Sequence, residues 1–348
     1  MLSTDSFFGR RRPTVLLCAF AAAYVVLGAA VPALAAAEEG LVVYSARKYQ
    51  LVEALFEEYG RERGVEVKFV TDDGAPLVQR LRAEGPRSPA DVLMTVDAGD
   101  LWRAKDAGLL RAVSSDVLTG NIPAHLRDPA GYWYGLSVRA RTIAYASERV
   151  RPDELSTYRD LADPRWKGRL CLRSGKHVYN QSLVAVLIAA NGEEETARIV
   201  SGWVVNLATA PFSSDTLLLE AIAAGQCDVG IVNSYYLGRL QNDRPGFPVA
   251  IHWADQEGNR VHVNISGAGV TRHARNPDEA VRFLEWLSTP EIQARFAGAN
   301  FEFPANPAVA PAAVVAAWGP FRQNELNVGK AGELQPAAVR LMDRAGWR

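Results

Sequence analysis

The sequence predicts an α/β fold of two lobes, because strands alternate with helices from residue 40 and two long extended runs divide the chain. Short apolar strands expected at Leu41–Tyr44 and Ala90–Val96 flank helical segments, as in a mostly parallel sheet with helices on its faces. The extended runs Leu136–Tyr145 and Asn264–Thr271 could each cross between lobes. Two crossing strands imply a mixed, mostly parallel sheet in each lobe and a cleft between them.

The other elements follow from the same periodicities. Gly64 ends the first helix, and Asn276, Pro277 and Asp278 form a start signal for the last long one. Helices are expected at Arg47–Arg63, Leu77–Ala83, Trp102–Leu109, Gln181–Ala190, Thr216–Ala224 and Pro277–Phe296, with further strands at Val65–Val70, Arg169–Leu172 and Asp228–Asn233.

The crossings also set the expected domain boundaries. An N-terminal lobe should comprise residues 38–141 and 266–316, and a C-terminal lobe residues 142–265 and 317–348. Ligands of open α/β sheets lie outside the carboxyl ends of strands. This rule places Tyr44–Tyr49 and Tyr235–Tyr236 at the cleft.

Composition limits the partners. The 348 residues suit two domains, and 48% hydrophobic with 22% charged residues is typical of a folded protein. The 38 Lys and Arg nearly balance the 39 Asp and Glu, so no basic excess points to nucleic acid or an anionic membrane. A small ligand is the expected partner.

Residues 1–37 are interpreted as a signal peptide. Arg10, Arg11 and Arg12 precede an apolar run to Leu34, and small residues favour cleavage near Ala35–Ala37. An uncleaved anchor is the alternative, and the adjacent arginines also permit twin-arginine export. Beyond this segment the chain has two cysteines, Cys171 and Cys227. After export they are expected to form a disulfide, with two buried free thiols as the alternative.

Catalytic motifs are missing from the sequence. It has no phosphate loop, dinucleotide turn, zinc-protease helix or nucleophile elbow, and its five histidines lack metal-ligand spacing. With no nucleophile–base pair to nominate, a binding protein is favoured over an enzyme.

Tyrosines stand at the ends of predicted elements. Tyr49 begins a helix after a strand, Tyr179 precedes the helix at Gln181, and the pair Tyr235–Tyr236 follows the strand that ends at Asn233. Two interpretations remain at this point: aromatic packing on a lobe surface, or four phenols that face one cleft.

Several segments together resemble a known family. They are Val43–Tyr49, Gly135–Arg141, Arg169–Ser174, Val178–Leu183, Gly225–Val229, Val232–Tyr236, Gly267–Val270 and Asn300–Pro304. In this order they resemble segments of the ferric-iron-binding proteins of bacterial iron ABC importers, and the likeness covers the chain after residue 38. The resemblance implies a periplasmic-binding-protein fold that closes on one Fe³⁺ and delivers it to an inner-membrane ABC permease. It also implies a periplasmic monomer that binds no nucleic acid, with iron ligands Tyr49, Tyr179, Tyr235 and Tyr236.

The chemistry of the residues agrees with this resemblance. Fe³⁺ is a hard cation that prefers anionic oxygen, and the metal must displace the phenol protons because tyrosine has a pKa near 10. Arg47, Arg139 and Arg141 are candidate counter-charges, with ordinary salt bridges as the alternative. Arg139 best matches the cleft arginine of the family.

Lys48 departs from the family pattern, which usually has a histidine at this position. An ammonium cannot coordinate iron, so Lys48 is hypothesised to be a counter-charge that leaves one metal position to water or to a synergistic anion such as carbonate. Glu57, Glu58 and Asp97 could supply a carboxylate instead, but a solvated surface position is expected for all three.

Three other functions remain open. The same fold could bind another solute, such as thiamine, a polyamine or an oxyanion. The chain could be an exported hydrolase or lyase, or a sensor that reports iron to a membrane receptor. Visible absorption by an iron–phenolate complex would distinguish the iron interpretations from the others.

Overall fold

The computed structural model describes residues 40–348, so the predicted signal peptide at 1–37 lies outside the described residues. Within the described part, no helix is long and apolar enough to cross a membrane. The strands are β1 Leu41–Ser45, β2 Val67–Thr71, β3 Val92–Thr95, β4 Tyr134–Ala146, β5 Leu170–Cys171, β6 Val229–Asn233, β7 Val249–His252, β8 Val263–Val270 and β9 Phe303–Pro304.

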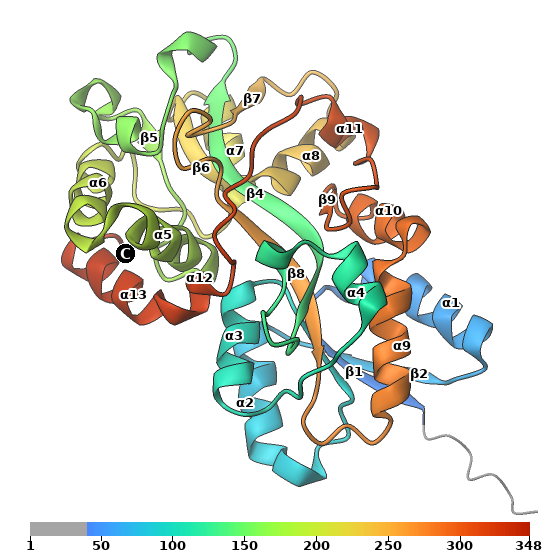
Figure 1. The fold of residues 1–348 in the computed structure, drawn as a ribbon. Helices are drawn as coiled ribbons and strands as arrows, with labels where there is room; N and C mark the ends of the chain where they lie inside the picture. The colour runs from blue at the N-terminus through green and yellow to red at the C-terminus, as the bar shows by residue number, and fades with distance from the viewer. Residues whose placement is uncertain (1–39) are drawn as a thin grey trace, which may run out of the picture. The chain divides into compact units, whose positions relative to one another are not determined.

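Helices surround these strands (Figure 1). They are α1 Glu53–Arg63, α2 Gly74–Glu84, α3 Ala98–Asp106, α4 Asp116–Asn121, α5 Val178–Asn191, α6 Glu193–Val205, α7 Asp215–Ala223, α8 Ser234–Asp243, α9 Pro277–Ser288, α10 Pro290–Gly298, α11 Ala313–Ala316, α12 Lys330–Glu333 and α13 Gln335–Arg344.

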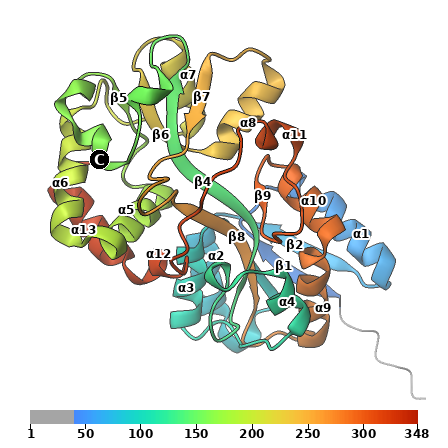
Figure 2. The ribbon, with the colours of Figure 1, turned by 45° about the horizontal axis from the view of Figure 1, so that its top comes forward.

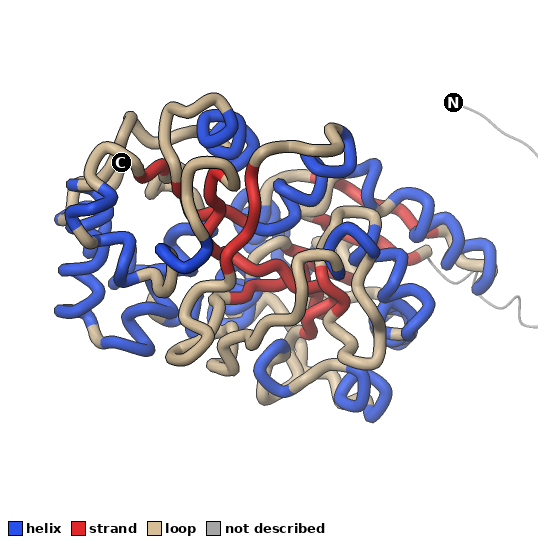
Figure 3. The backbone as a smooth tube through the Cα atoms, turned by 90° about the horizontal axis from the view of Figure 1, so that it is seen from above, coloured by secondary structure: helices blue, strands red, loops and turns tan. Residues whose placement is uncertain are grey.

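The strands form a mixed sheet in the order β2-β1-β3-β8-β4-β6-β5, and β7 and β9 also pair with β4. β1 is parallel to β2 and β3, and β5 is parallel to β6, whereas the pairs that involve β4 or β8 are antiparallel. Viewed from above, the strands run between flanking helices (Figure 3). The predicted α/β fold, with helices on a mixed sheet, is confirmed.

The two expected crossing runs are the paired strands β4 and β8. The first half of β4 pairs with β8 over Tyr134–Ala140, and its second half pairs with β6 over Arg141–Tyr145. A Cβ atom at Gly267 would lie 2.7 Å from the carbonyl oxygen of Tyr134, so glycine permits the close approach of β8 to β4. One long strand thus belongs to both halves of the sheet.

The part around β1, β2 and β3 is called the first lobe here. Alternate side chains of its strands enter two cores. Val43 packs with residues of α1, α9 and α10, whereas Tyr44 on the opposite face packs with residues of α2 and α3. The helices thus cover both faces of this half of the sheet (Figure 2).

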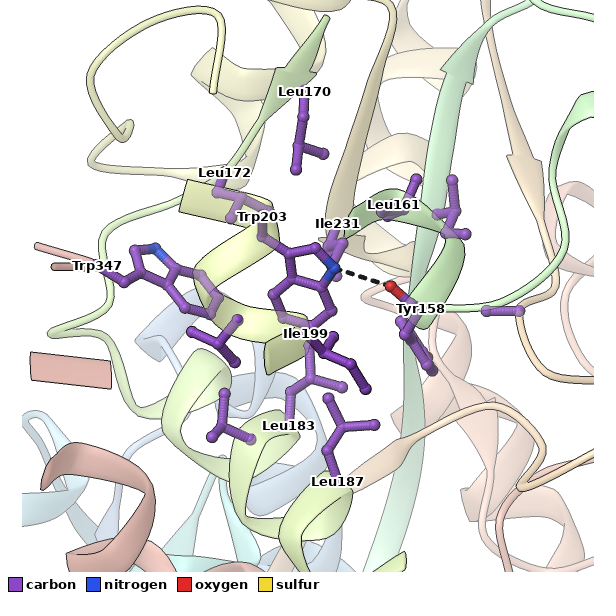
Figure 4. Close-up of a cluster of buried hydrophobic side chains, with 14 of the residues drawn as sticks. Tyr158, Leu161, Leu170, Leu172, Leu183, Leu187, Ile199, Trp203, Ile231 and Trp347 are labelled. Carbon is purple, nitrogen blue, oxygen red and sulfur yellow. Dashed lines mark hydrogen bonds between the residues drawn. The ribbon is translucent and has the colours of Figure 1, made fainter. Parts of the chain in front are cut away.

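The part around β5 and β6 is called the second lobe. One face packs against α5, α6 and α13, where the Trp203 indole N–H donates to the Tyr158 carbonyl at 2.8 Å (Figure 4). The other face packs against α7 and α8. The predicted disulfide between Cys171 and Cys227 is present, and it joins β5 to the segment that enters β6.

Some element boundaries differ from expectation. The first helix begins at Glu53, after a short 3₁₀ turn at Tyr49–Leu51. The expected helix Pro277–Phe296 is two helices, because Pro290 lacks an N–H and excludes a continuous helix. Helix α6 was not anticipated. The lobe boundaries predicted from the sequence stay a prediction.

Candidate metal centre

A cleft of about 440 Å³ brings side chains of both lobes together. Five of its lining residues are basic and two are acidic, so its walls carry an excess of positive charge. The lining residues are Ala46, Arg47, Lys48, Leu51, Asp73, Val96, Arg139, Arg173, His177, Tyr179, Ser214, Thr216, Tyr235, Tyr236, Arg239, Asn300 and Glu302.

Three tyrosines of the second lobe meet in this cleft. Tyr179 lies in the first turn of α5, and Tyr235 and Tyr236 lie in the first turn of α8. Because β6 ends at Asn233, the adjacent tyrosines follow helical geometry, and their rings stack with centroids 4.3 Å apart. The Tyr235 hydroxyl donates to the Tyr179 hydroxyl at 3.3 Å. Three phenol groups are therefore clustered.

Tyr49 is not part of this cluster. Its side chain is 51% exposed, its hydroxyl donates to Glu53, and its ring packs on Phe69 with centroids 5.1 Å apart. Its chain neighbour Lys48 and the nearby Leu51 line the cleft, whereas Tyr49 does not. The assignment of Tyr49 as an iron ligand stays a prediction.

Arg47 and Arg139 share the buried carboxylate Glu302. Its oxygens lie 2.9 Å from Arg47 Nη1 and 3.4 Å from Arg139 Nη2. Burial alone would raise the pKa of Glu302, but Arg139 and Arg47 beside it lower that pKa to about 2. The Arg139 guanidinium lies 5.6 Å from the Tyr235 ring centroid and 6.0 Å from that of Tyr179. Both predicted counter-charges thus line the cleft, and Arg139 lies beside two phenols.

Two further arginines in the cleft were missed by sequence reasoning. Arg173 Nη1 donates to the Tyr236 hydroxyl at 3.5 Å and lies 3.9 Å from a carboxylate oxygen of Asp215. Arg239 lies over the Tyr235 ring at 5.1 Å and donates to Asn300. Arg239 follows Tyr235 by four residues on one helix, a spacing that could have revealed it.

Arg141, the third predicted counter-charge, does not line the cleft. Its guanidinium is buried in the second lobe, where it donates to Asp215 at 2.9 Å and to Asn180 at 2.6 Å. An ordinary buried ion pair accounts for these contacts.

The predicted surface carboxylates have different environments. Glu57 is exposed and pairs with Arg61, and Glu58 pairs with Arg295 at the surface. The expected solvated position of Asp97 is wrong, because Asp97 is fully buried. Three donors surround this carboxylate, and two of them, Ser182 and Asn264, are distant in the sequence.

Tyr179 and Tyr235 keep their protons in the metal-free protein. Burial raises the pKa of Tyr179, although Arg139 opposes this shift, and burial followed by the neighbouring Tyr179 raises the pKa of Tyr235 well above 10. His177 is also neutral, because burial and then Arg173 lower its pKa to about 3. Its Nδ1 accepts the backbone N–H of Tyr179 at 3.3 Å, which caps α5.

Among residues 40–348, no group of three His, Cys, Asp or Glu side chains could hold a metal ion. The oxygen donors gathered in the cleft include three phenols, with several guanidinium groups nearby. Deprotonated phenols suit a hard, highly charged cation, and the arginines would stabilise their negative charge. The cleft is therefore a candidate site for such a cation.

The fold and the cleft define a solute-binding protein. The family model for bacterial extracellular solute-binding proteins matches residues 87–318, and the chain belongs to this family.

Its relatives include proteins named for iron. Iron uptake protein A1 of Synechocystis is 40% identical over 317 residues, which span 89% of this chain and 88% of that protein. A solved Trichodesmium structure, described as IdiA or FutA in complex with iron and citrate, has a TM-score of 0.86 at 42% identity and covers 89% of this chain and 100% of that one. A Bordetella ferric binding protein has a TM-score of 0.82 at 37% identity, with coverages of 88% and 99%.

Proposed function

We propose that this protein captures Fe³⁺ in the cleft between its lobes and delivers it to an inner-membrane ABC permease. The observation that carries the proposal is the cluster of Tyr179, Tyr235 and Tyr236 among arginines. Three phenolates would balance the charge of Fe³⁺, and the iron relatives support the choice of metal.

The first lobe would complete the site by moving toward the second. Tyr49 is exposed and follows Lys48, which lines the cleft, and on closure it would supply a fourth phenolate. Lobes at 38–141 with 266–316, and 142–265 with 317–348, would hinge through β4 and β8. This arrangement acts as a binding protein and requires no enzymatic step.

An anion would accompany the metal. Lys48 and Arg47 line the first-lobe side of the cleft, and Arg173 and Arg239 line the second. Four phenolates around Fe³⁺ leave a single negative charge, so these cations favour an additional anion. The sequence leaves this position to water or to a small anion such as carbonate, and citrate is the alternative suggested by the Trichodesmium relative.

Export to the periplasm as a monomer completes the proposal. The family is extracellular by description, and the predicted signal peptide at 1–37 would direct export. A sensor that reports iron to a membrane receptor would use the same cleft, and only the membrane partner separates it from a transport component.

Equilibrium dialysis of the mature protein tests the choice of solute. The protein is dialysed separately against ferric citrate, ferric iron with carbonate, thiamine, spermidine and phosphate. One tightly held iron per chain in either ferric arm supports the proposal, and the arm with tighter retention identifies the anion. Saturable binding of an organic solute without retained iron would contradict it.

A further inference from the structure

Asp97 is a carboxylate buried between the lobes. One oxygen accepts the backbone N–H of Gly99 at 2.7 Å, and the other accepts from the Asn264 amide at 2.7 Å and from the Ser182 hydroxyl at 2.8 Å. Asp97 and Ser182 are at most 1% exposed. Three hydrogen-bond donors thus hold the Asp97 carboxylate in place.

These donors come from three separate parts of the fold. Gly99 belongs to α3 of the first lobe, Asn264 lies on the shared strand β8, and Ser182 lies on α5 of the second lobe. Ser182 follows Tyr179 by three residues, so both are on neighbouring turns of one helix. The Asp97–Ser182 bond therefore links the first lobe to the helix that presents Tyr179.

A second route joins the same two helices. Arg103 of α3 donates to Gln335, whose amide donates to Gln181 of α5 at 2.7 Å. The short helix α12 packs against both α3 and α5 (Figures 1 and 2). The N-terminal turns of α5 are consequently held against α3 by two sets of contacts.

The buried carboxylate is costly, which argues for a specific role. Burial, followed by repulsion from Asp100, raises the pKa of Asp97 to about 7, and Arg139 and Arg103 are the cations that face it. A well-packed apolar contact would commonly be as stable as a buried charge or more so. The advantage of a carboxylate is that its hydrogen bonds are directional. The bond from Ser182 to Asp97 therefore forms in only one relative placement of α3 and α5.

We propose that Asp97 is a positioning residue for metal retention: its bond with Ser182 holds the Tyr179 helix against the first lobe. This inference rests on the proposed function. Loss of the bond weakens the hold of α3 on α5 and lets the cleft open more often, while the phenol groups themselves stay intact. Metal should then leave faster from an otherwise normal site.

The test compares iron release from the wild type and Ser182→Ala after transfer into excess chelator, followed through the iron–phenolate absorption. The loss of one buried hydrogen bond predicts about tenfold faster release. The absorption maximum should not move, since the phenols are unchanged. Ser182→Thr restores the hydroxyl and should return release toward the wild-type rate.

Thr196→Val is the matched control. It removes a buried hydroxyl whose bond at 2.7 Å to the Gly192 carbonyl stays within the second lobe. It should lower thermal stability to a similar degree and leave the release rate unchanged.

Asp97→Asn provides an independent test, because asparagine still caps α3 but cannot serve all the donors. It should also speed release, and adding Ser182→Ala to it should have little further effect. Wild-type release rates in Asp97→Asn, or in folded Ser182→Ala, would overturn the inference. No absorption band in the wild type would instead contradict the proposed function.

Discussion

The two walls of the cleft differ in how completely they are built. On the second-lobe wall, Tyr179, Tyr235 and Tyr236 are already in contact and two of them are buried. On the first-lobe wall, Arg47 and Arg139 are fixed by Glu302, but Tyr49 is turned onto Phe69 at the surface. The structure thus holds three clustered phenols on one wall, whereas Tyr49, the proposed fourth ligand, lies outside this cluster.

This difference suggests that the two walls have separate roles in metal binding. A preformed cluster of phenols can receive the metal without a large conformational cost. The exposed tyrosine can add its oxygen afterwards and couple occupancy to closure. Separate changes in the two walls should therefore have unequal effects.

The largest effect should come from the disulfide behind the second-lobe wall. Replacement of Cys171 and Cys227 by alanine removes a link across 56 residues, and the chain-entropy model predicts a loss of about 4 kcal/mol in the free energy of unfolding. Urea unfolding measures the loss, and a reductant should produce the same shift in the wild type. At urea concentrations below the unfolding transition, the iron affinity should stay unchanged. A loss of iron affinity in the alanine variant would show that the second-lobe wall depends on the disulfide for its binding geometry.

The second-largest effect should come from Glu302, which pairs with Arg47 and Arg139 in the first-lobe wall. The pKa of Glu302 is lowered from 4.5 to about 2, so its ionised form stabilises the folded state by about 3 kcal/mol at neutral pH. This contribution is complete above about pH 4.5 and is lost as the pH falls toward 2. Unfolding measured against pH should show the loss in the wild type.

Glu302→Gln should have a lower free energy of unfolding at neutral pH. Its free energy of unfolding should also lack the part of the decrease between about pH 4.5 and 2 that Glu302 causes in the wild type. Glu57→Gln, at an exposed position, serves as its control. An acid dependence that is unchanged in Glu302→Gln would mean that Glu302 does not fix this wall.

The third-largest effect should come from removing one phenol from the second-lobe wall. Tyr235→Phe keeps the ring but deletes an anionic oxygen, and we expect about a hundredfold weaker iron binding, the upper range for metal-site partners. Competition with a chelator gives the affinity. Tyr145→Phe, a buried tyrosine elsewhere in the second lobe, should bind iron normally. Equal affinities in the two variants would refute the assignment of Tyr235.

The smallest effect is expected for Tyr49→Phe. Tyr49 is exposed and is proposed to join the site only on closure, so its loss should weaken binding about tenfold and leave thermal stability unaffected. Tyr132→Phe, a partly buried tyrosine of the first lobe, is the control. A loss as large as that of Tyr235→Phe would remove the distinction between the walls.

The sequence predicted the order of elements because strand and helix periodicities are local. The strands β1, β3, β4 and β8 lie close to their expected positions, and the pair Cys171–Cys227 forms the expected bridge. Boundaries were less accurate where one residue decides them, as at Pro290.

Parts of the site depended on contacts that periodicity does not contain. Tyr235 and Tyr236 could be placed by the end of a strand, but the orientation of Tyr49 depends on Phe69 and Glu53. Asp97 looked like a surface residue, because its donor Ser182 lies 85 residues away in the sequence. Long-range hydrogen bonds of this kind become visible only in the folded chain.

The central claim is that the clustered phenols bind ferric iron. Its most direct test is the visible absorption spectrum of the mature protein, titrated with ferric citrate at neutral pH and then acidified. We predict a broad phenolate-to-iron band that saturates at one equivalent and bleaches in acid as protons return to the phenols. A folded protein that develops no such band would show that Tyr179, Tyr235 and Tyr236 are packing residues and would contradict the account.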